Sequence, residues 1–358
     1  MGLKNRKRGL FPLVLFLFML SVFTVCSKEE DDHIIESNGI YVENIKPYLV
    51  DEYVKTCMTI DSLMDEDCFL VGFITDLHYS AKGSKYHEKK LRTGVFNALD
   101  ALRELTFRYE FSQVILGGDY VQTWPSASDN IDIQQGIDCV TDALNAAREF
   151  NAPFFLLRGN HEVSYSGKPN DLGMTAEKFY RYSSSQINNP NLKLDSPNNW
   201  AYYDDLKNKV RYIFLDVVSA SGCPQNQFDW LQNTAGSIPD SFSVMVSSHY
   251  PLVNMGEREG NVKYNSVIQR MRKEGHPIIA CLGGHIHADW HNVVDSVLHV
   301  TTLQAGLWTP KPSEDGITYE HERDSYKESA FDILVINKKQ HKINLVRFGL
   351  GKDRCYKY

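Results

Sequence analysis

Five short apolar runs, each of strand length, recur through the chain. They are rich in β-branched and aromatic residues and occupy residues 69–75, 113–116, 153–157, 242–246 and 277–282. Buried strands have this length and composition. Two intervening segments have apolar residues at helical spacing instead, at Leu91, Val95, Leu99 and Leu102 and at Ile133, Ile137, Val140 and Leu144. Strands that alternate with helices predict parallel βαβ units.

Outside this region of alternating strands and helices, the sequence predicts a hairpin, a surface loop and a leader. Residues 331–336 and 342–348 are two further apolar runs, which predict a hairpin that closes a second sheet. Residues 310–328 are polar and turn-rich and predict a surface loop. Residues 26–65 predict a leader with a first strand or helix, ahead of one folded domain at residues 66–350.

Polar side chains follow each of the five runs at the point where the predicted strand ends. They are Asp76 and His78, Asp119, Asn160 and His161, His249, and His285 and His287. Because parallel sheets place ligands beyond the carboxyl ends of their strands, we expect these side chains to gather at one place. Imidazole and carboxylate together suit borderline divalent metals. Without His161 there are seven candidates, too many for one tetrahedral ion, and a carboxylate such as Asp119 can bind two ions, one through each oxygen.

Each cluster by itself has a simpler interpretation. Asp-x-His after a strand is commonly a turn with a solvated histidine, Gly-Gly-Asp is a turn signal, and His249 alone would be a hydrogen-bonded core residue. The pair His285 and His287 is more specific, because residues two apart on an extended segment point the same way. Five such clusters in one order predict a two-metal site, which clamps the attacking and leaving oxygens of a phosphate ester.

The ordered motifs D-x-H, G-D, G-N-H, H and G-H-x-H resemble those of the calcineurin-like metallophosphoesterase family over residues 66 to 348. The resemblance implies an α/β fold, a four-layer α/β/β/α sandwich of two mixed β-sheets flanked by helices. It implies two ions of Mn, Fe, Zn or Ni: one held by Asp76, His78 and His287, the other by Asn160, His249 and His285, with Asp119 bridging. A hydroxide between the ions would attack phosphorus. His161 would stabilise or protonate the leaving oxygen, since the pKa of imidazole lies near neutrality.

The chain differs from two subfamilies of this family in its second motif, which narrows the kind of phosphoesterase that the resemblance implies. In protein Ser/Thr phosphatases the second motif continues as Asp-Arg-Gly, whereas this chain continues as Gln122-Thr123-Trp124. Purple acid phosphatases have a tyrosine three places after the aspartate of that motif, where Gln122 stands. The resemblance therefore favours a phosphomonoester or phosphodiester hydrolase of the broader family. Arg158 is a candidate substrate-binding residue that contacts phosphate, and an ion pair with Glu162 or another nearby carboxylate is the alternative.

The amino terminus predicts export. Four basic residues precede an uncharged apolar stretch at 9–25, and Cys26 follows directly, ahead of an acidic run. A basic region and an apolar region of this length form a signal peptide at residues 1–25. Cys26 resembles the lipidated cysteine of bacterial lipoproteins, which predicts a tether at residues 26–65 to the outer membrane or cell surface. A periplasmic protein and an uncleaved membrane anchor are the alternatives.

Composition and charge fit an exported, folded protein. Hydrophobic residues make up 42% of the chain, enough for a substantial core. Residues 1–25 carry four positive charges and no negative ones, so their removal takes the formal charge from -7 to -11. An acidic body argues against a nucleic-acid partner. Among the cysteines, Cys139 and Cys281 are predicted to be buried thiols, and Cys57 and Cys68 are the pair expected to form a disulfide.

We therefore expect a membrane-tethered dimetal phosphoesterase that acts on small phosphate esters outside the cytoplasm. A nuclease of the same family is the first alternative, which the acidic charge counts against. A non-catalytic surface-exposed binding protein on the same fold is the second, and the complete ligand set counts against it. The sequence identifies neither the natural substrate nor the oligomeric state.

Overall fold

The computed structural model describes residues 35–37, 40–42, 44–79, 89–122, 133–163, 174–256, 258–306 and 311–358. The chain divides into two units, Met1–His33 and Ile34–Tyr358, and only the second contains described residues. The predicted signal peptide and the predicted lipidation site at Cys26 lie outside the described residues. No helix in the described ranges is long and apolar enough to cross a membrane.

The first sheet has six strands and carries the predicted βαβ units. Its strand order is β15 (Arg354–Lys357), β14 (Lys342–Gly349), β13 (Ala330–Asn337), β3 (Cys68–Ile74), β4 (Phe111–Leu116) and β5 (Phe154–Leu156). Strands β3, β4 and β5 are parallel, and α2 (Lys89–Arg108) and α3 (Ile133–Arg148) connect them. The parallel pairing and both helices predicted from the apolar spacing are confirmed.

The hairpin of β13 and β14 belongs to this first sheet, so the prediction that it closes the second sheet was wrong. β13 pairs antiparallel with β3 over six residues and with β14 on its other side. Both of its faces are apolar: Phe331, Ile333 and Val335 pack into the core under the helices, while Leu334 and Ile336 pack between the sheets. A strand that is apolar on both faces suits an inner position between two buried layers.

The second sheet has seven strands. In spatial order they are β11 (Trp290–Val294), β12 (Val297–Thr301), β10 (Ile278–Gly283), β9 (Ser243–Ser248), β8 (Val210–Leu215), β7 (Ala201–Asp205) and β6 (Leu192–Leu194). The four central strands are parallel, and β11, β7 and β6 add antiparallel edges. Both sheets are therefore mixed, as predicted.

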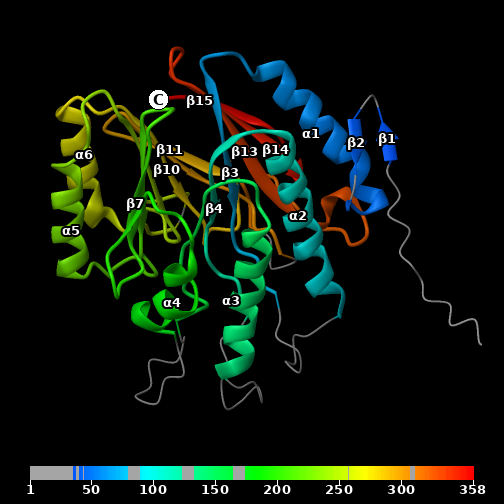
Figure 1. Cartoon of the computed structure of the whole chain (residues 1–358), viewed down its shortest axis with the longest axis horizontal. Helices are drawn as coiled ribbons and strands as arrows, with labels where there is room; N and C mark the ends of the chain where they lie inside the picture. The colour runs from blue at the N-terminus through cyan, green and yellow to red at the C-terminus, as the bar shows by residue number, and fades with distance from the viewer. Residues whose placement is uncertain are drawn as a thin grey trace, which may run out of the picture. The chain divides into compact units, whose positions relative to one another are not determined.

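Helices cover the outer faces of the two sheets. α1 (Val50–Leu63), α2 and α3 pack on the first sheet, and α5 (Gln225–Ala235) and α6 (Asn265–Lys273) pack on the second, as Figure 1 shows on opposite sides of the strands. A separate apolar cluster fills the space between the sheets. The four-layer α/β/β/α sandwich is confirmed, and α1 falls within the segment predicted to be a leader.

Shorter elements complete the described chain. They are the β1–β2 pair (Ile35–Ser37 and Ile40–Val42), α4 (Ala176–Tyr182) and four 3-10 helices at Pro47–Leu49, Ser184–Gln186, Val262–Tyr264 and Tyr326–Glu328. Residues 311–325 form no helix and only an isolated bridge between Pro312 and Thr318, in agreement with the predicted loop.

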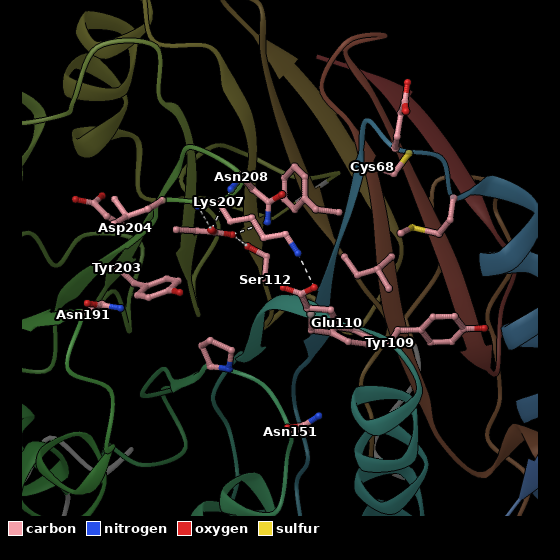
Figure 2. Close-up of a pocket in the computed structure, with 18 of the residues that line it drawn as sticks. Cys68, Tyr109, Glu110, Ser112, Asn151, Asn191, Tyr203, Asp204, Lys207 and Asn208 are labelled. Atoms are coloured by element: carbon pink, nitrogen blue, oxygen red, sulfur yellow. Dashed lines mark hydrogen bonds and ion pairs between the residues drawn. The ribbon is translucent and has the colours of Figure 1, made fainter.

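The two sheets are joined by polar contacts at the amino ends of β3 and β4. Ser112 of β4 donates a hydrogen bond to the carboxylate of Asp205 and lies 2.6 Å from the hydroxyl of Tyr212 on β8. These contacts border a cavity of about 650 Å³, where Ser112 lies beside Lys207 and Asn208 of the β7–β8 turn (Figure 2). The opposite end of the sheets, where the parallel strands finish, carries the polar clusters predicted from the sequence.

Candidate metal centre

The seven predicted metal ligands follow the carboxyl ends of five parallel strands. Asp76 and His78 follow β3, Asp119 follows β4, Asn160 follows β5, His249 follows β9, and His285 and His287 follow β10. The two sheets meet here, because Nδ1 of His249 lies 2.8 Å from the carbonyl oxygen of Gly117. The fold therefore brings together residues that are up to 211 positions apart in the chain, from Asp76 to His287.

These side chains form two groups that share one carboxylate. Ligand atoms of Asp76, His78, Asp119 and His287 lie within 4.8 Å of one another, and so do those of Asp119, His249 and His285. Asn160 belongs with the second group, since its Oδ1 is 2.8 Å from Nε2 of His249 and 2.7 Å from Nδ1 of His285. The resemblance predicted the same division between two metal ions, and the assignment of each ligand to an ion stays a prediction.

Distances within the groups suit metal coordination. In the first group Nε2 of His287 lies 2.9 Å from Nε2 of His78 and 3.3 Å from Oδ1 of Asp76. In the second, Oδ2 of Asp119 lies 3.2 Å from Nε2 of His249. Two ligand atoms that share an ion at about 2.1 Å are separated by roughly 3 to 3.5 Å. Each group therefore has the spacing of atoms around one ion.

A single oxygen of Asp119 faces both groups. Oδ1 accepts the backbone N–H of His161 at 2.7 Å, whereas Oδ2 is buried without a hydrogen-bond donor among the described residues. Oδ2 lies 3.7 Å from Nε2 of His78 in the first group and 3.2 Å from Nε2 of His249 in the second. A buried carboxylate oxygen with no donor is unfavourable unless a cation compensates it. The donor set therefore fits a pair of cations, with Oδ2 placed between them.

The backbone at the ligands is strained. Five of the seven have a positive φ: Asp76 (55°), His78 (43°), Asp119 (53°), His285 (66°) and His287 (58°). Residues other than glycine rarely adopt this left-handed conformation, which costs of order 1 to 3 kcal/mol at each position. Such strain concentrates at functional sites, where the surrounding structure holds the side chains in place.

Two glycines allow the motif loops to approach each other. A Cβ on Gly159 would lie 2.1 Å from Oδ1 of Asp119, and one on Gly284 would lie 2.2 Å from Oγ1 of Thr75. Neither position has room for a side chain. The glycines of the G-N-H and G-H-x-H motifs are therefore required by close packing between loops that follow different strands.

Glu162 fixes the loops that carry Asp119 and Asn160, a role that sequence reasoning missed. Its buried carboxylate accepts the backbone N–H groups of Asp119 (3.0 Å), Tyr120 (2.7 Å), Val121 (3.2 Å) and Gly159 (2.7 Å). Burial, together with the charge of Asp119, raises the pKa of Glu162 to about 7. The only sequence signal for this role is the position of the glutamate directly after Asn-His.

Hydrogen bonds outside the ligand set orient two of the ligands. The contact between Nδ1 of His249 and the carbonyl of Gly117 requires the proton on Nδ1, which directs the lone pair of Nε2 toward the site. Oδ2 of Asp76 accepts the hydroxyl of Thr75 at 2.8 Å and the backbone N–H of His285 at 3.0 Å. Outer contacts of this kind set the tautomer and orientation of metal ligands.

The electrostatics of the site favour the ionisation states that metal binding needs. Burial opposes the ionisation of Asp119, but the charges of the neighbouring histidines hold the pKa of Asp119 well below its usual range. Burial lowers the pKa of His78 to about 4 and that of His285 to about 3, so both are neutral at pH 7. Burial also acts to lower the pKa of His249, but the charge of Asp119 raises it to about 9. A metal at His249 would take the place of that proton.

His161 lies beside the ligands without joining either group. Its Nδ1 is 2.6 Å from the carbonyl oxygen of Gln122, its Nε2 is 4.0 Å from Oδ2 of Asp119, and its ring lies edge-on to that of His78. The side chain is 19% exposed, more than that of Asp119 or His78. The ring of His161 is therefore partly open to solvent at the edge of the ligand set.

Arg158, the candidate phosphate contact, is engaged elsewhere in the fold. Its Nε and Nη2 donate to the two carboxylate oxygens of Asp216 at 3.0 and 2.8 Å, and its Nη1 donates to the carbonyl of Met174 at 2.7 Å. The guanidinium is buried, and its carboxylate partner is Asp216 rather than Glu162. The structure thus places Arg158 in a bidentate ion pair, the alternative that the sequence left open.

None of the described cysteines forms a disulfide, so the prediction of a Cys57–Cys68 disulfide was wrong. Cys57 is fully buried in the core under the helices, whereas Sγ of Cys68 contacts the carbonyl of Leu63 and the amide of Asn337. Cys68 packs at the edge of the same core, and no disulfide joins it to Cys57. The prediction that Cys139 and Cys281 are buried is confirmed.

Comparisons with known proteins identify the family of the chain and proteins of similar fold. The family model described as calcineurin-like phosphoesterase matches residues 69–289, more than half of the chain. A dimetal phosphatase from Danio rerio has a similar fold, with a TM-score of 0.52 at 15% identity over 81% of this chain and 99% of that one. A purple acid phosphatase from yellow lupin (Lupinus luteus) gives a TM-score of 0.47 at 12% identity over 80% of this chain and 53% of that one. A search of curated proteins finds no match.

These findings define the class of the protein. The chain belongs to the calcineurin-like phosphoesterase family. It is a metal-dependent phosphoesterase with a candidate binuclear site built from Asp76, His78, Asp119, His249, His285 and His287.

Proposed function

We propose that the protein hydrolyses small phosphate esters, monoesters or diesters, outside the cytoplasm with two metal ions bound at this site. The observation that carries the proposal is the position of Asp119, whose Oδ2 accepts no hydrogen bond from the described residues and lies between the two groups of ligands. When bound, a pair of divalent ions lowers the pKa of a bound water and stabilises the charge that develops on the phosphate oxygens.

The residues of the chain would position this chemistry. Asp76, His78 and His287 would hold one ion, Asn160, His249 and His285 the other, and Asp119 both. Their strained backbone and the contacts of Glu162 would keep these atoms in place before a substrate binds. Preorganisation of this kind lowers the cost of reaching the transition state.

His161 would act as the general acid. With its Nδ1 proton donated to the carbonyl of Gln122, its Nε2 is the ring nitrogen that would give a proton to the leaving oxygen. Its partly exposed ring lies next to both ligand groups, within reach of a bound ester. This role needs no contact between His161 and a metal.

The first experiment is metal analysis of the purified protein together with hydrolysis of p-nitrophenyl phosphate and bis-p-nitrophenyl phosphate. We expect about two transition-metal ions per chain and turnover of at least one of the two esters, and the preferred ester will identify a monoesterase or a diesterase. Metal identity follows from reconstitution with manganese, iron, zinc or nickel. A protein that takes up no metal after this reconstitution would refute the proposal.

Location is a separate part of the proposal. The signal at residues 1–25 and the cysteine that follows it support an exported lipoprotein tethered through Cys26 to the outer membrane or cell surface. Replacement of Cys26 by serine should release the protein from the membrane fraction, with Cys355→Ser as the control at a distant cysteine. Retention of the Cys26→Ser protein in the membrane would support an uncleaved anchor instead.

A further inference from the structure

The second group of metal ligands is assembled from both sheets. Asn160 follows β5 of the first sheet, whereas His249 and His285 follow β9 and β10 of the second. Oδ1 of Asn160 lies 2.8 Å from Nε2 of His249 and 2.7 Å from Nδ1 of His285. The spacing of these ligand atoms therefore depends on how the end of β5 is held against the second sheet.

Strand β5 has a neighbour on one side within its own sheet. It is three residues long and lies at the edge of the described sheet, where it pairs with β4. An edge strand leaves the hydrogen-bonding groups on its outer side without a strand partner. The loop that carries Asn160 therefore needs contacts outside the sheet to fix its position.

Arg158 makes such a contact with the second sheet. It lies between β5 and Asn160, and its guanidinium donates to both carboxylate oxygens of Asp216, the first residue after β8, at 3.0 and 2.8 Å. Both side chains are buried. A bidentate pair of this kind fixes the orientation of the two groups as well as their distance. The pair therefore holds the end of β5 against the end of β8.

Asp216 is itself held in place by a helix of the second sheet. Its backbone N–H donates to Oε1 of Gln227 at 2.8 Å, and its carbonyl oxygen accepts Nε2 of the same side chain at 3.1 Å. Gln227 lies on α5 and is fully buried. The carboxylate that Arg158 contacts therefore belongs to a backbone segment that α5 fixes.

The same segment after β8 contacts the loop of the histidine ligands. The carbonyl oxygen of Val217 accepts the backbone N–H of Tyr250 at 3.0 Å. Tyr250 directly follows His249, and its ring stacks on that of His285 at 3.7 Å between centroids. These contacts lead back to the two histidines whose nitrogens lie next to Oδ1 of Asn160, and so form a closed ring around the second group.

The first ligand group is joined to the second sheet by other contacts. The backbone N–H groups of Ala305 and Gly306, which follow β12, donate to the carbonyl oxygens of Thr75 and Asp76 at 2.9 and 3.0 Å. These bonds join the sheets at the end of β3 and do not involve Arg158. The ligands of the first group should therefore keep their positions when the ion pair is lost.

We propose that the Arg158–Asp216 pair positions Asn160 for the second metal ion and sets the affinity for that ion independently of the first. The inference rests on the proposed two-metal function and adds a residue that acts through Asn160 without being a metal ligand. Arg158 is therefore a positioning residue. Its loss should weaken one of the two metal-binding steps, whereas a general loss of structure would weaken both.

The test is calorimetric titration of the metal-free protein with manganese or zinc, in which two binding steps should appear. His78→Ala and His249→Ala each remove a ligand of one group and thereby assign the two steps. Arg158→Lys retains the charge and loses the bidentate geometry. The step of the second group should weaken by about 10- to 100-fold, the usual effect of removing a contact that orients a metal ligand. The step of the first group should change by less than about twofold.

A double variant separates positioning from folding. Arg158→Met combined with Asp216→Leu replaces the buried pair by apolar side chains, a change that often preserves stability because no unpaired charge is left. Urea unfolding without metal should give the wild-type free energy, while the step of the second group weakens as in Arg158→Lys. The matched control is Arg211→Lys, a buried arginine with its own bidentate pair to Asp204 at the other end of β8. It should alter neither step.

The possible outcomes separate this inference from the proposed function. Two binding steps that weaken equally in Arg158→Lys and in the double variant, or that do not weaken in either, would overturn the inference and leave the two-metal phosphoesterase intact. A wild-type protein that binds fewer than two ions would overturn both.

Discussion

The backbone N–H of His161 donates to Oδ1 of Asp119 at 2.7 Å and thereby leaves Oδ2 as the atom that faces both groups of metal ligands. Sequence reasoning expected Asp119 to bind one ion through each oxygen. In the structure one oxygen holds the backbone of His161, and the other lies 3.7 Å from Nε2 of His78 and 3.2 Å from Nε2 of His249. One carboxylate thus couples the two metal groups to the group that we propose protonates the leaving oxygen.

The first prediction concerns this carboxylate. Asp119→Asn retains the size of the side chain and removes its charge, so the position between the two groups no longer attracts two cations. We expect the variant to bind at most one metal ion per chain and to lose at least about a hundredfold in kcat, because paired ions stabilise both the attacking and the leaving oxygen. Metal analysis by mass spectrometry and the p-nitrophenyl phosphate assay measure the two effects.

The control for this variant is Asp240→Asn, an exposed carboxylate in the turn before β9. It should retain both the metals and the activity of the wild-type protein. Two metal ions in Asp119→Asn, bound as tightly as in the wild-type protein, would contradict the bridging role.

The second prediction concerns His161. His161→Ala should retain both ions, because its ring belongs to neither ligand group. For an alkyl ester, whose leaving oxygen needs a proton, turnover should fall by about 10² to 10⁴, the usual contribution of a general acid. For p-nitrophenyl phosphate the loss should be much smaller, because p-nitrophenolate leaves without protonation. Equal losses on the two esters would rule out the general-acid role, and His291→Ala, an exposed histidine on β11, is the control.

The sequence predicted the fold and the ligand set because both depend on local signals. Short apolar runs that end in Asp, Asn or His predicted the strands and the position of the ligands beyond their carboxyl ends. The placement of β13 could not be read in this way, since its partner β3 lies more than 250 positions earlier in the chain. Its two apolar faces are the only local sign of an inner position.

Sequence alone could not reveal the contacts that hold the ligands. The left-handed backbone of Asp119 and the four N–H groups around Glu162 depend on loops that follow different strands. The ion pair of Arg158 with Asp216 could not be predicted from the sequence either, because the two residues are 58 positions apart. The sequence left phosphate, Glu162 and another carboxylate as partners of Arg158. The packing of β5 against β8 across the two sheets, where Phe155 stacks on Phe214, accompanies the pairing with Asp216.

The third prediction concerns Glu162, which contacts the ligand loops without being placed as a metal ligand. Glu162→Gln replaces one of the two acceptor oxygens by an NH₂ group, which cannot accept a hydrogen bond. The variant therefore loses some of the four hydrogen bonds from backbone N–H groups that the carboxylate accepts. We expect metal affinity to fall by about 10- to 100-fold, the usual effect of removing a group that orients metal ligands. Titration of the metal-free protein with manganese or zinc measures this affinity.

The matched control for Glu162 is Glu177→Gln, an exposed carboxylate on α4. Excess metal should restore most of the activity of Glu162→Gln, since the ligands themselves remain. An unchanged metal affinity would show that the motif loops hold their positions without this carboxylate.

The fourth prediction concerns stability in acid. His299 on β12 is 2% exposed, neither of its ring nitrogens has a hydrogen-bond partner among the described residues, and burial lowers its pKa from 6.5 to about 4. Between these two values the unfolded chain binds the proton and the folded chain does not, so stability falls as pH falls from 6.5 toward 4. Below both values the loss from this residue amounts to about 3 kcal/mol.

A matched pair of variants isolates this contribution from the other titrating groups. His299→Leu removes the buried imidazole, and His341→Leu removes an exposed one in the β13–β14 turn. Urea unfolding of the metal-free proteins at pH 7 and pH 4.5 gives the free energy of unfolding at each pH. From pH 7 to pH 4.5 the free energy of unfolding should decrease by about 2 kcal/mol less in His299→Leu than in the wild-type protein. In His341→Leu it should decrease by the same amount as in the wild-type protein. If His299→Leu loses as much stability as the wild-type protein, then His299 is protonated in the folded state, and burial does not hold it neutral.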